Sequence, residues 1–342
     1  MGNLWSVRFL LEISYPPIPI WEVGPVRLSL HGVMAALGFL LGAQYAVKRA
    51  NRRGFDGEAF QSILTWALVG AIIGARYFTA PAAIVGGTPF FDALNPINGN
   101  FSILGGMAGG IIAAAIRSRM LRQPVLALFD AASFGLAIGT IVGRVGDLLI
   151  VEHLGSATTF ALGYGIKPGY DVAPQHDPLE CSVAEAVDGL CGVYHHSAAY
   201  DLLGAALLLG VLFWLYKHWK PRHYGQMFAF WVAWYGFQRF LIDFSRLVPG
   251  DQSAVAQAAA DATLGPFTWS QWSGLGAGFF GIFLIWRFRK TQPVVSEMKD
   301  HAIAAAAGRP QPATGDHEVD TDPESPDDSG DEAAVASDLD VE

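Results

Sequence analysis

Long runs of apolar residues, separated by short polar stretches, fill most of the first 290 residues of the chain. A helix needs roughly 20 mostly apolar residues to cross the hydrocarbon core of a bilayer. Seven stretches have about that length and composition, which predicts seven transmembrane helices. They run at about 28–47, 60–79, 101–116, 125–141, 199–216, 227–244 and 267–286. The third is short and rich in Gly, so we expect either a broken helix or a closely packed one.

The composition supports the same interpretation. Of the 342 residues, 52% are hydrophobic and only 15% are charged, and the mean hydropathy is +0.32. A soluble protein of this length needs more charge to cover its surface. We therefore predict an all-α fold: a polytopic integral membrane protein of about seven transmembrane helices, with an external loop region, a disordered acidic tail and no nucleic-acid partner.

The predicted helices divide the chain into three parts. Residues 1–27 contain Pro16, Pro17 and Pro19, which favours an external or interfacial segment over a span or a cleaved signal peptide. Residues 28–290 form the transmembrane domain, with an external loop at 151–197 between helices four and five. Residues 291–342 are predicted to be a disordered cytoplasmic tail.

The net charge of −9 is concentrated in that tail. From Pro310 onward the sequence has twelve acidic residues and no Lys or Arg, and setting these twelve aside leaves +3 for the rest. Such a segment buries too little apolar surface to offset the entropy of ordering it. We interpret it as a solvated tail, with recruitment of a partner as the alternative.

Positive charges indicate which way the helices cross. Lys and Arg residues cluster after every odd-numbered predicted helix, whereas residues 80–100 have none and residues 151–197 have only Lys167. Loops rich in Lys and Arg stay in the cytoplasm. We therefore expect the N-terminus outside and the C-terminus inside. The clustered residues are Lys48, Arg49, Arg52, Arg53, Arg117, Arg119, Arg122, Lys217, Lys220, Arg222, Arg287, Arg289 and Lys290.

Arginines also lie near the predicted external ends of helices two, four and six. Arginines at these positions usually extend to lipid headgroups or pair with carboxylates such as Asp243 and Glu152. That interpretation is weaker for Arg239, because it lies inside an apolar span and must face protein or a wet cavity. A guanidinium in such a place suits a phosphate group. The four arginines are Arg76, Arg144, Arg239 and Arg246.

One stretch of helix six places several polar residues together. In YGFQRFLIDFSR, the residues Tyr235, Arg239, Asp243 and Arg246 follow one another at spacings of four, four and three, which is one face of a helix. With Arg144 on a different helix at the same level, this face predicts a site for a phospholipid headgroup.

The two cysteines of the chain, Cys181 and Cys191, both fall in the predicted external loop. An oxidising exterior allows a disulfide that closes a loop of about ten residues. Two free thiols are the alternative.

Three motifs resemble those of the bacterial phosphatidylglycerol–prolipoprotein diacylglyceryl transferases. GRVGDLLIVEHLG resembles the family signature at Gly143, Arg144, Gly146, Glu152 and Gly155, with Asp147 where the family has Asn. HHSAAYD keeps His195 and Tyr200, with Asp201 for Glu, and YGFQRFLIDFSR keeps Tyr235, Arg239, Phe240 and Arg246, with Asp243 for Glu. GARYFTA resembles the Gly-x-Arg end of the family's second helix, and FTWSQWSGL the entry to its last. The resemblance covers roughly residues 25–290.

Two further departures affect the expected chemistry. The family's Ser-Phe-His-Gly-Gly at the start of helix three reads Ser-Ile-Leu-Gly-Gly here, so that its histidine is Leu104. The family's Tyr-Gly in helix one reads His31-Gly32. The imidazole has moved to another helix, or the enzyme works with less base assistance, or its activity is altered.

The resemblance implies transfer of the diacylglyceryl group of phosphatidylglycerol to the cysteine thiol of a prolipoprotein lipobox, with release of glycerol 1-phosphate. It implies a multi-pass protein of the bacterial plasma membrane that needs no metal or other cofactor. Arg144 and Arg239 would stabilise the leaving phosphate, Glu152 and Asp243 would orient them, and His31 or His195 would accept the thiol proton.

Each of these assignments has an alternative. His31 packing in the core and His195 as an ordinary loop histidine remain open. Asp147, Gly155, Tyr235, Arg246 and Arg76 are predicted to help bind phosphatidylglycerol. A catalytically altered relative that binds phospholipid or lipoprotein precursors is the alternative function, and a transporter is disfavoured because no clear inverted repeat is seen.

Overall fold

The structure is a computed structural model. It describes residues 13–19, 21–23, 26–77, 80, 84, 89–94, 103–151, 154–160, 162–170, 186, 189–246 and 263–307. The chain divides into two units, Met1–Pro310 and Gln311–Glu342. All described residues belong to the first.

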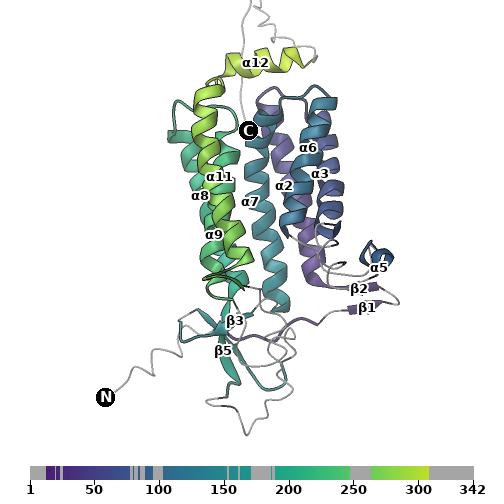
Figure 1. The fold of residues 1–342 in the computed structure, drawn as a ribbon, viewed down its shortest axis with the longest axis vertical. Coiled ribbons are helices and arrows are strands. Elements are labelled where there is room, and N and C mark those ends of the chain that lie inside the picture. Colours follow the sequence, from purple (N-terminus) through teal and green to yellow (C-terminus); the bar gives the residue numbers. More distant parts are fainter. Residues whose placement is uncertain are drawn as a thin grey trace, which may run out of the picture. The chain divides into compact units, whose positions relative to one another are not determined.

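Seven long helices run alongside one another in this unit (Figure 1). Each coincides with one of the seven apolar stretches. Their bounds are α2 (Leu30–Arg52), α3 (Gly57–Tyr77), α6 (Ile103–Met120), α7 (Val125–Ile150), α8 (Ser197–His218), α9 (Gln226–Asp243) and α11 (Trp269–Thr291). Among the described residues, α2, α3, α7 and α8 are both long enough and apolar enough to cross a membrane.

The outer surface of these helices is apolar. Leu40, Ile72, Leu207, Leu241 and Phe279 are each more than half exposed. A soluble monomer rarely exposes apolar side chains over so many helices, whereas lipid chains solvate them well. The chain is therefore a polytopic membrane protein.

Glycines bring the helices together in three close pairs. A Cβ on Gly42 of α2 would overlap the carbonyl oxygen of Gly135 on α7. Gly74 and Gly105 meet in the same way between α3 and α6. Between α9 and α11, a Cβ on Gly236 would overlap the backbone of α11. Small residues four apart let helix backbones approach closely in lipid. The Gly-rich third stretch is thus one continuous helix, α6, and the closely packed alternative is the right one.

The remaining core is aromatic and aliphatic. Large side chains that are almost fully buried lie between the helices, mostly toward the end where α2 stops and α3 starts. They include Phe55, Phe60, Ile63, Leu128, Phe134, Leu212 and Met227.

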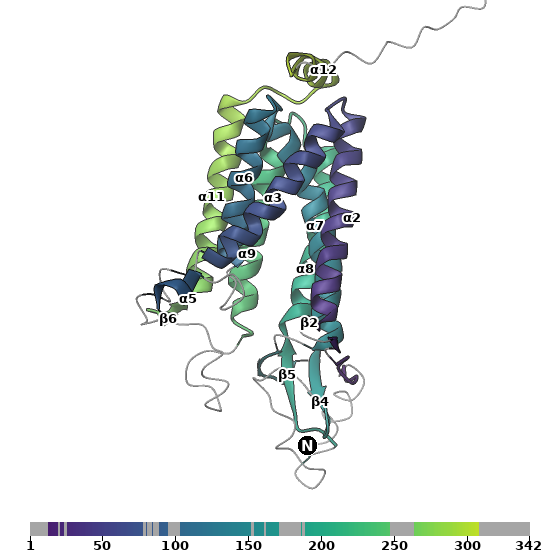
Figure 2. The same cartoon turned by 90° about the vertical axis from the view of Figure 1, so that its right-hand side faces the viewer.

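Short strands lie at the opposite end, where α7 ends and α8 begins (Figure 2). The strands β3 (Leu154–Ala157), β4 (Gly163–Ile166) and β5 (Gly192–His196) form an antiparallel sheet in the order β3-β5-β4. The hairpin of β1 (Trp21–Val23) and β2 (Val26–Leu28) precedes α2, and β6 (Thr263–Leu264) with β7 (Phe267–Thr268) precedes α11. A short helix, α5 (Phe90–Leu94), follows α3. The all-α prediction missed these strands, because three- to five-residue strands in a loop carry too little periodicity to detect.

The segment before α2 is tied to this sheet. The Ile13 amide donates to the Gly163 carbonyl at 3.2 Å, and the Ile18 amide donates to the Leu149 carbonyl at 2.9 Å. The Tyr15 hydroxyl donates to the Leu148 carbonyl at 2.5 Å. Residues 13–19 therefore lie against the end of α7 and the sheet, on the side predicted to be external.

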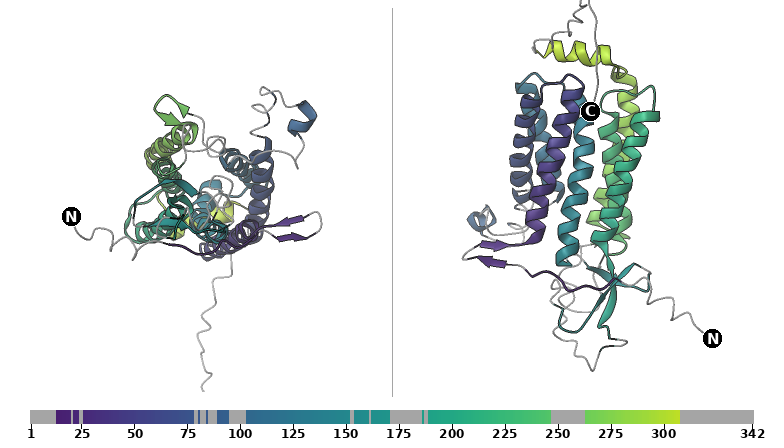
Figure 3. Two further views of the ribbon diagram at one scale, coloured as in Figure 1. Left: turned by 90° about the horizontal axis from the view of Figure 1, so that it is seen from below. Right: turned by 180° about the vertical axis from the view of Figure 1, so that it is seen from behind.

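One boundary prediction was wrong. Residues 291–342 were expected to be disordered, but α12 (Glu297–Ala306) is a helix that starts at the N-cap Ser296. It lies at the end of the helices away from the sheet (Figure 3, right). Asp300 of α12 accepts two hydrogen bonds from Arg53, at 2.8 and 3.0 Å, and one from the Tyr224 hydroxyl at 2.5 Å. This buried ion pair holds the segment in place. Residues 308–342 lie outside the described residues.

Candidate active site

Arg144 lies in the last two turns of α7 and is held between two carboxylates. Its Nη1 is 2.5 Å from Oδ2 of Asp147, and its Nη2 is 2.8 Å from Oδ2 of Asp201 on α8. Both aspartates are buried, and the Arg144 side chain is 18% exposed. Charge-assisted pairs of this kind fix the plane of a guanidinium. Arg144 is therefore rigid and still partly accessible.

His31 lies in the first turn of α2, beside the same carboxylate. Its Nδ1 contacts Oδ1 of Asp147. The His31 side chain is 46% exposed, so the core-packing alternative is wrong. The close crossing of α2 and α7 brings it there, because a Cβ on Gly146 would lie 2.9 Å from the His31 Cα.

Arg239 forms a second cluster on α9. Its Nη2 lies 3.1 Å from Oδ1 of Asp243, and its Nε donates to Oγ of Ser270 on α11 at 2.8 Å. The Arg246 Nε is 3.7 Å from the same Asp243 oxygen. The predicted helix face is thus present. The Arg246 side chain is 27% exposed against 16% for Arg239, so it is nearer to solvent, as expected.

Asp243 is fixed by the start of α11. The Thr268 hydroxyl donates to Oδ2 of Asp243 and also accepts from the Gln271 amide at 3.0 Å, as the N-cap of α11. The Gln271 side chain accepts from the Thr268 amide at 2.9 Å, which completes a capping box. The helix start and the acidic partner of Arg239 are therefore one hydrogen-bonded unit.

The two arginine clusters are connected. Tyr235 of α9 lies near both Arg144 and Arg239. Gln238 Nε2 lies 3.2 Å from Oδ1 of Asp201, the partner of Arg144, and Gln238 Oε1 accepts from the Trp234 indole at 2.8 Å. Arg144 with its partners on α2, α7 and α8, and Arg239 with its partners on α9 and α11, therefore lie close together, and we call these two clusters the arginine network.

The sheet contributes a histidine beside this end of the helices. His195 of β5 hydrogen-bonds through Nδ1 with the Tyr200 hydroxyl at 2.9 Å. Burial lowers the pKa of His195 below its usual value, because the charged imidazolium loses solvation. A Cβ on Gly155 of β3 would overlap the Ser245 carbonyl oxygen. Gly155 therefore has a packing role that lets β3 approach the end of α9.

For the other predicted site residues, the structure describes only some of the side chains. Arg76 lies in the last turn of α3 and is 3% exposed. Cys191 is disulfide-bonded, but Cys181 lies outside the described residues, so their pairing stays a prediction. Glu152 also lies outside the described residues, as does the side chain of Leu104. Among the residues that are described, no group of three or more His, Cys, Asp or Glu side chains is arranged to hold a metal.

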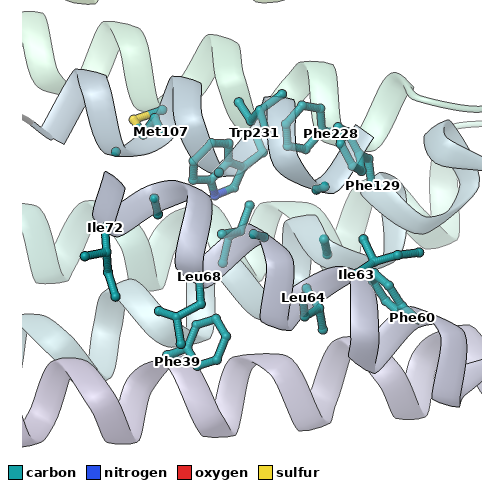
Figure 4. A pocket seen from close by; sticks show the side chains of 18 of the residues that line it. Phe39, Phe60, Ile63, Leu64, Leu68, Ile72, Met107, Phe129, Phe228 and Trp231 are labelled. Carbon is teal, nitrogen blue, oxygen red and sulfur yellow. The ribbon is translucent and has the colours of Figure 1, made fainter. Parts of the chain in front are cut away.

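An apolar cavity extends between the helices from near this end. It has a volume of about 520 Å³ and is lined by side chains of α2, α3, α6, α7 and α9. Figure 4 shows Phe39, Ile72, Met107 and Trp231 among them. A second cavity of about 320 Å³ between α2 and α7 shares Phe39 with the first and reaches Gly143, the residue before Arg144. Apolar space thus extends along α7 as far as Gly143, and neither lining includes any of the side-chain partners of Arg144 and Arg239 given above.

The sequence of the chain matches a known family over most of its length. The family model of prolipoprotein diacylglyceryl transferases matches residues 19–287. The chain belongs to this family. Its members are transferases.

Curated members of the family are similar in sequence but vary in length. Each of three is named phosphatidylglycerol–prolipoprotein diacylglyceryl transferase. The one from Thermus thermophilus is 29% identical over 65% of this chain and 81% of its own length. The one from Nocardia farcinica is 28% identical over 69% of this chain but only 48% of its own length. The one from Rhodococcus jostii is 28% identical over 70% of this chain and 68% of its own.

Four of the residues that differ from the resembled motifs of the diacylglyceryl transferases lie in or beside the carboxylate pairs of Arg144 and Arg239. His31 stands where the family pattern has Tyr, and Asp147 stands where it has Asn, and these two side chains touch. Asp201 and Asp243, which replace Glu, are the carboxylate partners of Arg144 and Arg239.

Four polar residues of the network were not predicted from the sequence. Asp201 was named in its motif, but its pairing with Arg144 was not predicted. No role was assigned to Gln238, the residue before Arg239. Thr268 and Ser270 stand in FTWSQWSGL, where a capping box was the detectable signal. Their contacts join residues that are 25 to 57 positions apart in the sequence, which no local pattern reveals.

Proposed function

We propose that the chain transfers the diacylglyceryl group of phosphatidylglycerol to the lipobox cysteine thiol of prolipoproteins and releases glycerol 1-phosphate. The observation that carries this proposal is the arginine network. Arg144 and Arg239 lie on neighbouring helices, α7 and α9, and each is held by a carboxylate. A phosphodiester with two glycerol arms suits two such fixed guanidinium groups.

Apolar space beside the arginines supports a lipid substrate. The cavity that reaches Gly143 shares the lining residues Phe39 and Leu64 with the larger cavity along α3. With the phosphate at Arg144 and Arg239, the acyl chains extend into this space. Excluding water there strengthens the attraction between the guanidinium groups and the charge that forms on the leaving phosphate.

The proposed chemical step is a displacement at a glycerol carbon, in which the phosphate is the leaving group. The thiolate sulfur attacks the glycerol carbon, a carbon–sulfur bond forms, and the carbon–oxygen bond to phosphate breaks. The leaving glycerol 1-phosphate keeps the electron pair, and Arg144 and Arg239 stabilise it. His31, oriented by Asp147 and partly exposed, takes the thiol proton. It supplies the imidazole that the family pattern places at position 104.

The proposed topology puts this site at the external end of the helices. All seven long helices span the bacterial plasma membrane, residues 28–290 form the transferase domain, and the N-terminus lies outside with the C-terminus in the cytoplasm. The asymmetry of Lys and Arg between alternate loops supports this orientation. A prolipoprotein signal peptide presents its cysteine on that side of the membrane.

A second candidate function is binding without catalysis. Leu104 favours it, because the family's histidine is missing there. The chain would then hold phosphatidylglycerol or a lipoprotein precursor in the arginine network and leave it unreacted.

Transfer of labelled diacylglyceryl from phosphatidylglycerol to a lipobox peptide tests both candidates. We expect transfer by the unmutated protein. Arg144→Ala and Arg239→Ala should each reduce it by about 10²–10³, because each removes a donor aimed at developing charge. Arg246→Ala is the control and should lose less, since its pair is longer and more exposed.

Two results would contradict the proposal. Near-normal transfer in both Arg144→Ala and Arg239→Ala removes the role of the two guanidinium groups. An unmutated protein that binds phosphatidylglycerol but neither transfers its diacylglyceryl group nor complements a strain lacking its own transferase favours the binding function.

A further inference from the structure

A groove between α2 and α3 lies away from the arginine network. Its volume is about 740 Å³. At one end it is lined by polar side chains of the last turns of α2 and the first turns of α3, and at the other by apolar ones. The polar residues are Gln44, Lys48, Asn51, Arg52, Gln61 and Thr65, and the apolar ones are Phe39, Leu40, Ala43, Val47 and Leu64.

The groove exists because α2 and α3 have different partners. Along their lengths, the close glycine contacts join α2 to α7 and α3 to α6. The close contact between α2 and α3 lies only at the turn that connects them, where a Cβ on Gly57 would overlap the Asn51 side chain. Two helices that each pack closely on another neighbour leave space between them. That space opens where Leu40, which is 55% exposed, faces outward.

The cations at its polar end form no ion pair within the described residues, and on their other side they line a pocket with Glu297 and Asp300 of α12. Lys48 and Arg52 are exposed and take part in no ion pair among the described residues. Arg53 provides the contrast, because Asp300 holds it in a bidentate pair. A lysine and an arginine four residues apart on one helix face form a ready site for an anion.

The apolar end fits a hydrocarbon chain. Phe39, Ala43 and Leu64 line both this groove and the cavity between α2 and α7. A ligand with an anionic head and an apolar tail therefore matches the groove along its length. A soluble phosphate compound matches only the polar end.

We infer that this groove binds one anionic phospholipid, with its phosphate between Lys48 and Arg52 and an acyl chain along Phe39 and Leu64. Lys48 and Arg52 are about 25–30 Å along α2 from His31, at 1.5 Å per residue. The lipid therefore lies in the opposite leaflet from the reacting one. The inference rests on the proposed membrane-spanning arrangement, but not on catalysis.

Native mass spectrometry of the detergent-solubilised full chain with phosphatidylglycerol tests this inference. The unmutated protein should retain two lipids, one at each end of α2. Lys48→Gln with Arg52→Gln should retain one and bind the lost lipid about 30-fold more weakly, since each cation near a lipid phosphate contributes roughly fivefold. Phosphatidylcholine should not replace that lipid.

A matched control removes the same charge elsewhere. Lys217→Gln with Lys220→Gln takes two exposed cations from the end of α8, outside the groove, and should leave two lipids bound. Ala43→Leu fills the groove without changing charge and should also weaken the second lipid. An unchanged lipid count in both Lys48→Gln/Arg52→Gln and Ala43→Leu overturns the inference.

Two further arms separate the possible results. Arg144→Ala with Arg239→Ala should lose the other lipid. If that variant keeps two lipids while Lys48→Gln/Arg52→Gln keeps one, the groove stands and the proposed phosphate site fails. Displacement of the groove lipid by millimolar glycerol phosphate would show that the site selects a soluble phosphate, and this too would overturn the inference.

Discussion

At the scale of single residues, the two arginine clusters differ in charge balance. Arg144 faces two carboxylates, Asp147 and Asp201, whereas Arg239 and Arg246 share one, Asp243. The second cluster therefore carries a surplus positive charge. The first carries a surplus negative charge unless His31 is protonated. A phosphate is thus attracted mainly by the second cluster, and the proton that neutral His31 takes from the thiol brings the net charge of the first cluster to zero.

This balance predicts that His31 and Asp147 act as a pair. His31→Tyr alone leaves the Asp147 carboxylate without its imidazole, and Asp147→Asn alone leaves His31 without its orienting acceptor. Each should lower transfer about tenfold or more. The double variant restores the family's residues at both positions and should lose less than the two effects combined, by about 0.5–3 kcal/mol of coupling. The rates of diacylglyceryl transfer by the four proteins measure this, and strict additivity would show that the contact has no catalytic role.

The lowered pKa of His195 predicts a pH effect on stability. In the unfolded chain the imidazole titrates near its ordinary value of about 6.5. Because the folded pKa is lower, the unfolded state binds more protons as the pH falls below about 6.5, so that stability decreases with falling pH until the folded His195 is itself protonated. His195→Gln should remove this part of the pH dependence. Thermal unfolding in detergent between pH 5 and 8 is the measurement, with Tyr200→Phe as the control that keeps the imidazole. Identical slopes for His195→Gln and the unmutated protein would contradict the assignment.

At the scale of elements, the close packing of the helix pairs requires glycine, which has no side chain, at the crossing points. At Gly42 and Gly135 a methyl group would meet a carbonyl of the facing helix, which cannot move without shifting α2 against α7. The arginine network lies along the same crossing, because His31 and Asp147 belong to these two helices. The close packing in the middle of the α2–α7 pair therefore also determines how His31 and Asp147 are positioned at its end.

Substitutions at the crossing should be costly, and a matched change elsewhere harmless. Gly42→Ala and Gly135→Ala should each destabilise the protein by about 1–3 kcal/mol through overpacking and reduce transfer by displacing His31. Gly210→Ala in α8, where nothing lies within 4 Å of the added carbon, should be neutral or slightly stabilising because Ala favours a helix. Thermal unfolding and transfer assays on the three variants decide this. Equal stability of Gly42→Ala and Gly210→Ala would contradict the close packing.

The elements also show what the sequence can predict. Apolar run length predicts the long helices, and the spacing of Arg239, Asp243 and Arg246 predicts their shared face. The Arg144–Asp201 pair was not predicted, because it depends on which helices become neighbours. α12 was missed because the acidic composition of the tail obscured a short capped helix held by Asp300. Long-range pairing and single buried contacts are not contained in local periodicity.

At the scale of the whole molecule, the proposed orientation connects the two ends of the bundle to the two faces of the membrane. The sheet and the arginine network lie at one end. At the other lie α12 and the exposed Lys48 and Arg52, which form no ion pair within the part of the chain that the structure describes. Only one orientation gives a secreted prolipoprotein access to the network.

Reporter fusions test that orientation. Fusions after Arg53, Arg122 and Arg222 should be cytoplasmic, and fusions near Asn98 and Asp177 should be external, because Lys and Arg keep their loops inside. Enzymatic reporters active on one side of the membrane provide the measurement. A cytoplasmic signal at Asp177 would reverse the topology and place the network on the wrong face.

The glycine-lined pairing of α2 with α7 also sets an order of events during synthesis. About 100 residues separate the end of α2 from the end of α7. At about 5–20 residues per second, the ribosome takes on the order of 5 to 20 seconds to supply them. Throughout that time the first long helix is without its partner and His31 is without its carboxylate. During this interval the glycine-lined face of α2 that later packs on α7 is uncovered. Surrounding lipids or a membrane chaperone must cover that face until α7 has been synthesised.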